Sequence, residues 1–452
     1  MLFSSIVFQS LLNRKVQTDS ESDISLTDSQ NDDLQKITEE IKTKQITKLI
    51  VGGDYYTIPS FDGLSFVKIV EIQSQNIDTI EPNTFKDNRN IQKVILTANV
   101  QYILDNAFEN STISEINLEN VVEIAREAFK NCKFIQTLKL SQLRTLGSSA
   151  FENTPITELK FIDEMTSIPA RLCYNCRNLT TVESNAQDIS DYAFYNCTSL
   201  SKITYSKNLY WFGFYVLAMT KVEELYFGNR IPDLNLVPLK KLIIGINNDN
   251  YKIPDLPTLK IIEFTKDCKI INLRNLHVEE VIFPSDPDYR YSIDITNYNL
   301  KEFPPGLETV NFVANMPELE KVDLTYCTYI KRNSFFNCPK LKEIIGWGEH
   351  SMTVESSLFE LCPLINIKTW TNQINISSQV NGYDDNNGVL SYTYITEMTI
   401  KGFNSQSYDP KFYCCKDLKK VVIEEGSGLT YIASYQFANC TSLSEVTLSS
   451  EI

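Results

Sequence analysis

The feature that most constrains this chain is a sequence element that recurs every 21 to 23 residues. It reads Phe-Lys-Asn-Cys-Lys-Phe-Ile-Gln-Thr-Leu-Lys-Leu at 129–140 and Phe-Tyr-Asn-Cys-Thr-Ser-Leu-Ser-Lys-Ile-Thr-Tyr at 194–205. The Phe position recurs at Phe85, Phe108, Phe129, Phe151, Cys173, Phe194 and Val216, and again at Phe335, Phe359, Phe412 and Phe437. A unit this short cannot bury its apolar face alone, so neighbouring units must stack into a solenoid.

The positions of the repeat predict the course of one coil. The alternating apolar residues at its end indicate a short strand, and parallel stacking of such strands predicts one long β-ribbon. The Phe fills the space between the ribbon and the opposite wall, and the alanine that often precedes it suits a short helical turn. We therefore expect an α/β solenoid of about 17–19 right-handed coils, with one long parallel β-ribbon and short helical turns.

Two further positions are polar or sulfur-containing. An asparagine follows the Phe by two residues at Asn110, Asn131, Asn153, Asn175, Asn196, Asn337 and Asn439. Stacked in register, these amides form a ladder that satisfies backbone groups at the turn, and we expect the ladder to be buried. The next position holds Cys132, Cys176, Cys197, Cys338, Cys362, Cys415 and Cys440, with Ser111, Thr154 and Met219 as replacements. This exchange favours reduced, packed thiols, and disulfides between adjacent coils at 176/197, 338/362 and 415/440 are the alternative.

Composition shifts divide the chain. Residues 1–32 are expected to be a disordered acidic segment, because the chain is polar and acidic from residue 16 onward. Residues 33–45 carry helical spacing that predicts a capping helix. The solenoid is expected over 46–452, with an irregular stretch at 228–330 and an insertion at 371–394, where the period lengthens. The end after the last strand pattern has no polar cap. This predicts a frayed coil, a shortened sequence, or self-association through the uncapped C-terminal end.

Several function classes are excluded by residue types. The net charge of −15 disfavours nucleic acid as a partner. The sequence contains no run of 18 apolar residues, so it predicts no membrane span. The only histidines, His277 and His350, have no partner at metal or triad spacing. Cys173 and Cys176 have a redox-like spacing, but the repeat explains both positions. We therefore expect no catalytic, cofactor-binding or metal-binding residues, and no enzyme.

The full repeat, as at 189–205, reads I-x-x-x-A-F-x-N-C-x-x-L-x-x-V-x-L. In this pattern the chain resembles the BspA-like branch of leucine-rich-repeat proteins, known from mucosal bacteria and parasitic protozoa, over residues 46–452. The resemblance implies a cell-surface antigen or adhesin that binds proteins. It transfers no binding residue, because the shared positions are structural.

A binding surface is expected on the outward strand positions. There, acids and bases alternate from coil to coil, as on a solvated face. Four residues interrupt this pattern and are candidates for a shallow apolar protein-binding stripe rimmed by charge: Tyr226, Ile243, Ile282 and Ile345. The alternative is scattered exposed apolar residues, which are normal.

Two functions follow from these observations. The family resemblance favours a cell-surface or secreted adhesin, whereas the N-terminus lacks the charge order of a secretory signal and the cysteines have no evident partners. The second hypothesis is therefore an intracellular protein–protein interaction scaffold. In both, the partner is a protein.

Overall fold

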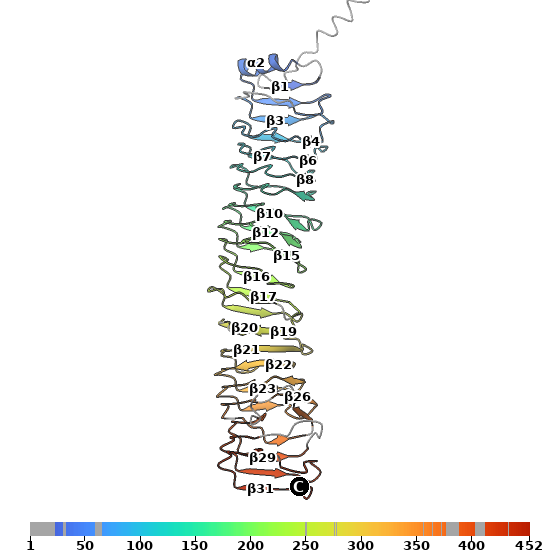
Figure 1. Cartoon of the computed structure of the whole chain (residues 1–452). Helices are drawn as coiled ribbons and strands as arrows, with labels where there is room; N and C mark the ends of the chain where they lie inside the picture. Colours follow the sequence, from blue (N-terminus) through green and yellow to red (C-terminus); the bar gives the residue numbers. More distant parts are fainter. Residues whose placement is uncertain are drawn as a thin grey trace, which may run out of the picture. The chain divides into compact units, whose positions relative to one another are not determined.

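The computed structural model describes residues 23–29, 33–58, 66–248, 251–274, 276, 278–355, 357–363, 365–371, 373–376, 388–402, 412–432 and 434–452. They form two compact units, Met1–Leu225 with Pro232–Lys240, and Tyr226–Ile231 with Lys241–Ile452. Each unit is a stack of coils, and the parallel-strand solenoid has about 18 turns (Figure 1).

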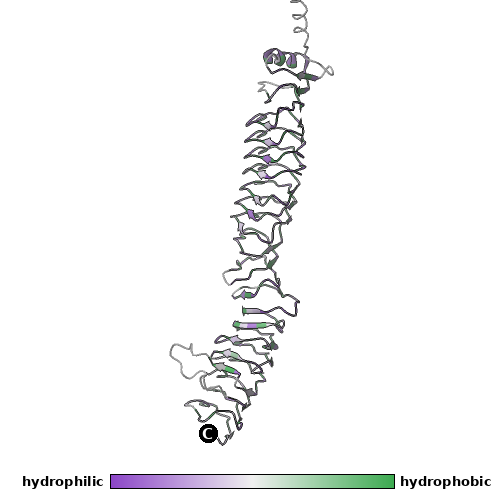
Figure 2. Cartoon of the chain, turned by 90° about the vertical axis from the view of Figure 1, so that its right-hand side faces the viewer, coloured by the Kyte–Doolittle hydropathy of each residue, from purple (hydrophilic) through white to green (hydrophobic). Residues whose placement is uncertain are grey.

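In the first unit each regular coil contributes two short strands. The first wall is the predicted ribbon: β1 (Asp23–Leu26), β2 (Lys48–Val51), β3 (Ile69–Ile72), β5 (Lys93–Ile95), β7 (Glu115–Ile116), β10 (Glu158–Lys160), β12 (Thr181–Glu183) and β14 (Lys202–Ile203). The second wall is β4 (Thr79–Ile80), β6 (Tyr102–Ile103), β8 (Glu123–Ile124), β9 (Thr145–Leu146), β11 (Ser167–Ile168), β13 (Asp188–Ile189) and β15 (Trp211–Phe212). Figure 2 turns the second-wall side of Figure 1 toward the viewer.

The second unit repeats the two walls. β16 (Glu224–Phe227) contains the boundary between the units. The first wall of the second unit holds β17 (Lys241–Ile244), β18 (Ile261–Phe264), β20 (Glu280–Ile282), β23 (Lys321–Asp323), β25 (Glu343–Ile345), β27 (Thr369–Trp370), β29 (Glu397–Ile400), β30 (Lys420–Ile423) and β31 (Glu445–Thr447). The second wall holds β19 (Ile270–Leu273), β21 (Tyr291–Thr296), β22 (Leu307–Ala314), β24 (Tyr329–Ile330), β26 (Met352–Val354) and β28 (Ile374–Ile376).

The prediction of one long ribbon is wrong. In the first unit the first wall splits into the sheets β1-β2-β3-β5-β7 and β10-β12-β14, because residues 138–140, predicted as a strand, pair with neither neighbour. The second wall of that unit splits into β4-β6-β8-β9 and β11-β13-β15. All described pairings are parallel and join successive coils, so the coil period itself holds through these breaks.

A column of buried phenylalanines fills the space between the walls. The ring centroids of Phe85 and Phe108 are 5.0 Å apart, those of Phe108 and Phe129 are 5.0 Å apart, and those of Phe129 and Phe151 are 5.8 Å apart, all in stacked geometry. Within the second unit Phe335 stacks on Phe359 at 5.1 Å. The prediction that the phenylalanines lie one above another is confirmed.

The turns that carry the Phe are not helical. Each such turn of the first unit contains two residues with positive φ, four positions apart, such as Glu127 (φ 56) and Asn131 (φ 61). In the second unit the turns of Phe335 and Phe359 have a third, at the Phe itself. A left-handed residue every four positions is incompatible with an α-helix. Alternate N–H groups instead donate to the next coil: Phe108 N to Ala128 O at 2.7 Å, and Asn110 N to Lys130 O at 2.8 Å. The expected helical turns are therefore replaced by turns hydrogen-bonded between coils.

The asparagine ladder is present, but it lies at the surface. Nδ2 of each residue donates to Oδ1 of the one before it, at 2.8 Å for Asn131 to Asn110, 2.8 Å for Asn153 to Asn131, 2.5 Å for Asn175 to Asn153 and 2.7 Å for Asn196 to Asn175. These side chains are half-buried or exposed, so the expectation of a buried ladder is wrong. Asparagine suits this position because it tolerates the left-handed backbone.

The Cys position requires a buried hydrogen-bond donor. The Cys132 thiol donates to the carbonyl of Phe108 at 2.9 Å, in the preceding coil. At the same position the Thr154 hydroxyl donates to Phe151 O at 2.7 Å. This shared role explains why cysteine and threonine exchange there.

In the coil that contains residues 215–220, the structure places each position of the turn one residue later than the sequence pattern predicts. Met219 has φ 63 and is exposed, so it occupies the Asn position. The next residue, Thr220, is buried and donates to Leu217 O at 2.7 Å, as a residue at the Cys position does. Leu217 therefore takes the Phe position that the sequence assigned to Val216.

The first coil begins earlier than predicted. Residues 1–32 were expected to be disordered, yet β1 pairs in parallel with β2 and buries Ile24 and Leu26. The predicted helix is α2 (Leu34–Lys44), capped by Asp33, with Ile37 and Ile41 buried. The helix follows the first strand, so the solenoid starts at β1 and not at residue 46. The remaining residues of 1–32 outside 23–29 lie outside the described residues.

Two irregular stretches differ in kind. Within 228–330 the Phe-Asn-Cys turn is absent, and the longer strands β21 and β22 take its place around the stacked, buried rings of Tyr289 and Tyr291. Within 371–394, β28 pairs with β26 in the array. The turn at 388–393 is also regular, since the Cys415 thiol donates to Leu390 O at 3.0 Å. The extra length falls on 377–387, outside the described residues.

We expect Phe129→Ala to lower the free energy of unfolding by about 3–5 kcal/mol, because it leaves a cavity in the aromatic column. Phe134→Ala, five residues away at an exposed position (55% exposed), serves as the control and should change it by less than about 0.5 kcal/mol. Urea unfolding of both variants measures the difference. Equal effects would contradict the column's role.

Two substitutions, Asn153→Ala and Asn153→Gly, distinguish the contribution of the left-handed backbone at residue 153 from that of its side-chain amide. Both remove the ladder hydrogen bonds, but only alanine places a Cβ in the left-handed region, at φ 56. We expect the alanine variant to be about 1–2 kcal/mol less stable than the glycine variant. Thermal unfolding compares them, and an alanine variant as stable as the glycine variant would contradict the assignment.

Candidate protein-binding site

The outward face of the first wall is lined by ion pairs between successive coils. Lys48 pairs with Glu71 at 2.8 Å and Lys93 with Glu115 at 2.7 Å in the first unit. In the second unit the pattern recurs, for example at Lys420–Glu445, 2.5 Å. Exposed pairs of this kind contribute little to stability, on the order of 0–1 kcal/mol each. They leave most of this face polar and internally neutralised.

The four stripe residues all lie on the second unit, and all are half-buried. The strand register places Glu263 between Ile243 and Ile282, and Asp323 beside Ile345. Carboxylates therefore separate these candidates from one another.

The fourth stripe residue, Tyr226, lies over the following coil. A Cβ on Gly245 would stand 2.5 Å from its hydroxyl oxygen, so the glycine leaves room for the ring. The partial burial that results raises the pKa of Tyr226. The stripe stays a proposal.

A cluster of tyrosines projects from the turns of the first unit. Tyr174 stacks on Tyr195 with centroids 5.1 Å apart, and Tyr192 stacks on Tyr215 at 5.5 Å. An edge contact at 5.7 Å between Tyr192 and Tyr195 joins the two stacks. The guanidinium of Arg171 lies 3.9 Å from the centre of the Tyr174 ring. The rings hold one another in place, so their edges and hydroxyl groups face outward in a fixed arrangement.

Three more exposed aromatics precede Tyr215 on the same coil. Tyr210 is 61% exposed, Trp211 43% and Phe214 58%. The Tyr210 hydroxyl donates to Asp188 at 3.3 Å, and the backbone N–H of Phe214 donates to Asp191 at 2.8 Å. We call the following set the aromatic face: Tyr174, Tyr192, Tyr195, Tyr210, Trp211, Phe214 and Tyr215.

The aromatic face was missed at the sequence level. Four of its tyrosines, Tyr174, Tyr192, Tyr195 and Tyr215, occupy the position after the Phe or the first left-handed position of the turn. The earlier coils of the first unit fill these positions with charged, amide or small residues such as Lys130 and Ser149. The run Tyr-Trp-Phe-Gly-Phe-Tyr at 210–215 was the available signal. Aromatic residues are enriched in protein interfaces.

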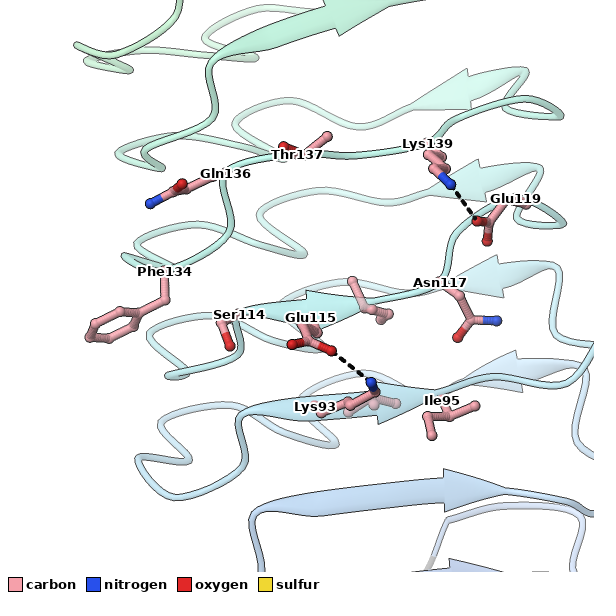
Figure 3. Close-up of a pocket in the computed structure, with 12 residues that line it drawn as sticks. Lys93, Ile95, Ser114, Glu115, Asn117, Glu119, Phe134, Gln136, Thr137 and Lys139 are labelled. Carbon is pink, nitrogen blue, oxygen red and sulfur yellow. Dashed lines mark ion pairs between the residues drawn. The ribbon is translucent and has the colours of Figure 1, made fainter.

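A shallow hollow of about 730 Å³ marks the break in the first wall (Figure 3). It lies between β7 and the unpaired segment 136–139. Lys93–Glu115 and Lys139–Glu119 pairs, at 2.7 and 4.0 Å, cross it, and Phe134 stands at its edge. Paired charges and an open mouth give the hollow no evident catalytic chemistry.

The sulfur and imidazole groups are held in structural contacts. All eleven cysteines are free. Burial raises the pKa of the Cys132 thiol to about 12, and Cys173 and Cys176 are fully buried. The His350 ring nitrogen Nε2 lies 2.8 Å from Cys327 O, and His277 lies outside the described residues. In the described part of the chain, no group of three His, Cys, Asp or Glu residues could hold a metal ion.

A family model described as a BspA-type leucine-rich-repeat region, with six copies, matches residues 59–180, 122–236, 291–387 and 386–452. The chain belongs to the BspA-type leucine-rich-repeat family. Residues 237–290, between the matched BspA-type segments, lie where the Phe-Asn-Cys turn fades. No curated protein matches the chain. None of the helices in the described ranges combines the length and apolar character needed to cross a membrane.

Three bacterial proteins of solved structure are similar to this BspA-type chain. A leucine-rich-repeat protein of Bacteroides ovatus is 16% identical, with 87% of this chain and 85% of that chain covered and a TM-score of 0.33. A leucine-rich cell surface protein of Faecalibacterium prausnitzii is 14% identical (89% and 87% covered, TM-score 0.28). The pneumococcal vaccine antigen PcpA is 14% identical (84% and 80% covered, TM-score 0.25). These TM-scores are low, so the family membership rests on the BspA-type repeats.

Thiol alkylation of the native BspA-type chain tests the buried Cys position. The thiolate is the reactive form, so burial and the raised pKa of Cys132 should protect it from iodoacetamide at mildly alkaline pH. Cys414 and Cys440 are half-exposed and should be modified first. Peptide mass spectrometry at timed intervals measures each site. Modification of Cys132 as fast as Cys414 would contradict the burial of this position.

Proposed function

We propose that this protein is a non-catalytic binding protein whose aromatic face contacts a protein partner, and that it acts at the cell surface or after secretion. The observation that carries the proposal is the cluster of exposed aromatic side chains on the turns of the first unit. Tyrosine, tryptophan and arginine are the residues most enriched at energetically important positions of protein interfaces.

The geometry of the aromatic face favours recognition over aggregation. The paired stacks of Tyr174 with Tyr195 and Tyr192 with Tyr215 fix four rings before any partner arrives. These four rings therefore lose less side-chain freedom when a partner binds than mobile rings would. The hydroxyl groups at the edges supply hydrogen-bond donors and acceptors beside apolar surface.

The face extends to neighbouring apolar side chains. Met219 and Leu236 are both exposed, and the backbone N–H of Met219 donates to Leu236 O at 3.0 Å, which places the two residues side by side. Contiguous exposed apolar surface of this kind is rare on monomeric proteins and marks interaction sites.

The cell-surface part of the proposal rests on the family, whose members are described as surface antigens or adhesins. The second candidate function, an intracellular scaffold, is favoured by the eleven free cysteines, because thiols stay reduced inside cells. The same alkylation, applied to protein isolated from its source and unfolded without reductant, separates the two. Complete alkylation favours the scaffold, and sites blocked by disulfides favour the exported protein.

Trp211→Ser combined with Phe214→Ser should lower partner recovery at least about tenfold, since aromatic hot spots contribute about 2 kcal/mol or more. The matched control is Tyr226→Ala with Ile243→Ser on the candidate stripe of the second unit. Affinity capture from the source organism's environment, quantified by mass spectrometry, compares them with the unmodified chain. Loss of partners only in the control would move the site to the stripe, and unchanged recovery in the Trp211 and Phe214 variant would refute the aromatic face.

A further inference from the structure

Beside the asparagine ladder of the first unit runs a groove lined by amides and unpaired cations. One hollow of about 640 Å³ is lined by residues that include Arg89, Asn110 and Lys133. A second, of about 470 Å³, is lined by residues that include Lys133, Asn153 and Arg177. Asn131 and Lys133 line both. The two hollows are therefore adjacent, and we call them together the amide groove.

The cations of the groove recur on alternate coils. Two residues after the Asn position stand, in order, Arg89, Thr112, Lys133, Pro155, Arg177 and Thr198. Successive cations are thus separated by two coils, or about 10 Å at ~4.8 Å per parallel strand. All three are exposed. Neutral residues fill the intervening coils, so no acid interrupts this row.

Two acids near the groove pair with cations that do not line it. Glu109 pairs with Lys86 at 2.8 Å, and Glu152 pairs with Arg171 at 3.0 Å. Asp87 lines the groove and accepts a hydrogen bond from the Asn110 amide at 2.8 Å. Within the described residues no ion pair involves the three groove cations, although Arg177 Nε donates to Asn175 Oδ1 at 3.0 Å.

The amides add neutral hydrogen-bonding groups at every coil. Within the ladder each amide uses one N–H to donate to the previous asparagine and one lone pair to accept from the next. Each primary amide has two donors and two acceptor lone pairs. Each interior rung therefore keeps one donor for a ligand, in a side chain already held in place by the ladder. Asn131 and Asn153 also keep one acceptor, whereas the second lone pair of Asn175 accepts from Arg177 Nε.

We propose that the amide groove binds an extended anionic glycan, with sulfate or carboxylate groups on Arg89, Lys133 and Arg177 and sugar hydroxyls on the asparagine amides. Widely spaced anions separated by hydroxyl groups match a row in which cations alternate with amides. A nucleic acid carries roughly one phosphate per 3.4 Å along each strand, which is far denser than this row. The net charge of −15 repels a polyanion from the rest of the chain, so binding is confined to the groove.

The binding site is independent of the protein-binding proposal, because neither the three cations nor the ladder asparagines belong to the aromatic face. The test therefore uses the full chain with defined glycan probes. Immobilised heparin supplies sulfates and immobilised hyaluronan supplies carboxylates alone, both near physiological ionic strength. Binding to at least one is expected, with the preferred probe identifying the anion, and binding should weaken as salt is raised.

The variant Arg89→Gln, Lys133→Gln, Arg177→Gln should bind at least about tenfold more weakly, since three exposed charge contacts are lost. The matched control Lys36→Gln, Lys202→Gln, Lys207→Gln removes the same charge from exposed positions of the same unit. It should bind like the unmodified chain, and circular dichroism should show both variants folded.

Four results would overturn the proposal. The first is absence of binding to both glycans, and the second is full binding by the groove variant. The third is an equal loss in the control, which would show a response to net charge alone. The fourth is stronger binding of single-stranded polyuridylate, lost in the groove variant, which would make the occupant a nucleic acid.

Discussion

Hydrogen bonding between successive coils is the constraint on which the rest of this structure depends. In the strands it runs as parallel ladders, and in the turns it continues through alternate N–H groups, as from Phe108 to Ala128. The turns achieve this with left-handed residues four positions apart, which redirect the backbone toward the next coil. Once every coil is tied to its neighbour in register, equivalent side chains must stack. The phenylalanine column and the asparagine ladder are consequences of that register.

The sequence predicted what stacks but not how the backbone makes it stack. The Phe, Asn and Cys positions recur strictly enough that their columns could be inferred, and only the coil of Leu217 was aligned wrongly, because it carries none of the three residues. The second wall was missed, since a strand of two residues such as Tyr102–Ile103 is too short to show alternation. The sequence does not distinguish the turns that carry the Phe from helical turns, because a tight i, i+3 turn and a helical turn both accept the small residue before the Phe. The strand β1 was hidden inside an acidic stretch, where only Ile24 and Leu26 mark it, and its partner lies beyond a helix.

The candidate site was harder to predict than the fold for a related reason. Stacking restricts the inward positions, so those positions define the repeat and carry no information about a partner. Residues that bind a partner can therefore lie only at outward positions. These positions vary from coil to coil, so the repeat pattern does not show which of them bind. The stripe residues were chosen on strands, yet carboxylates such as Glu263 separate them. The tyrosines at turn positions form direct contacts across coils, because the turns also stack in register. Outward residues are therefore best compared column by column, including the turns.

Charge follows the same logic and explains why an acidic chain can hold a cationic groove. Most strand-borne lysines on the first wall face a glutamate one coil away, as Lys93 faces Glu115, so their charges cancel locally. The net negative charge of the chain therefore comes from other positions. A column of equivalent positions without acidic residues is then locally positive if it contains lysine or arginine. The column of Arg89, Lys133 and Arg177 is such a case. In each of these coils the cation stands two residues after the position of the asparagine ladder. At the coil of Tyr174 and Asn175 the aromatic face and the amide groove meet at adjacent residues. A regular stack can thus present two unlike surfaces at neighbouring positions of one turn, because each column varies independently of the next.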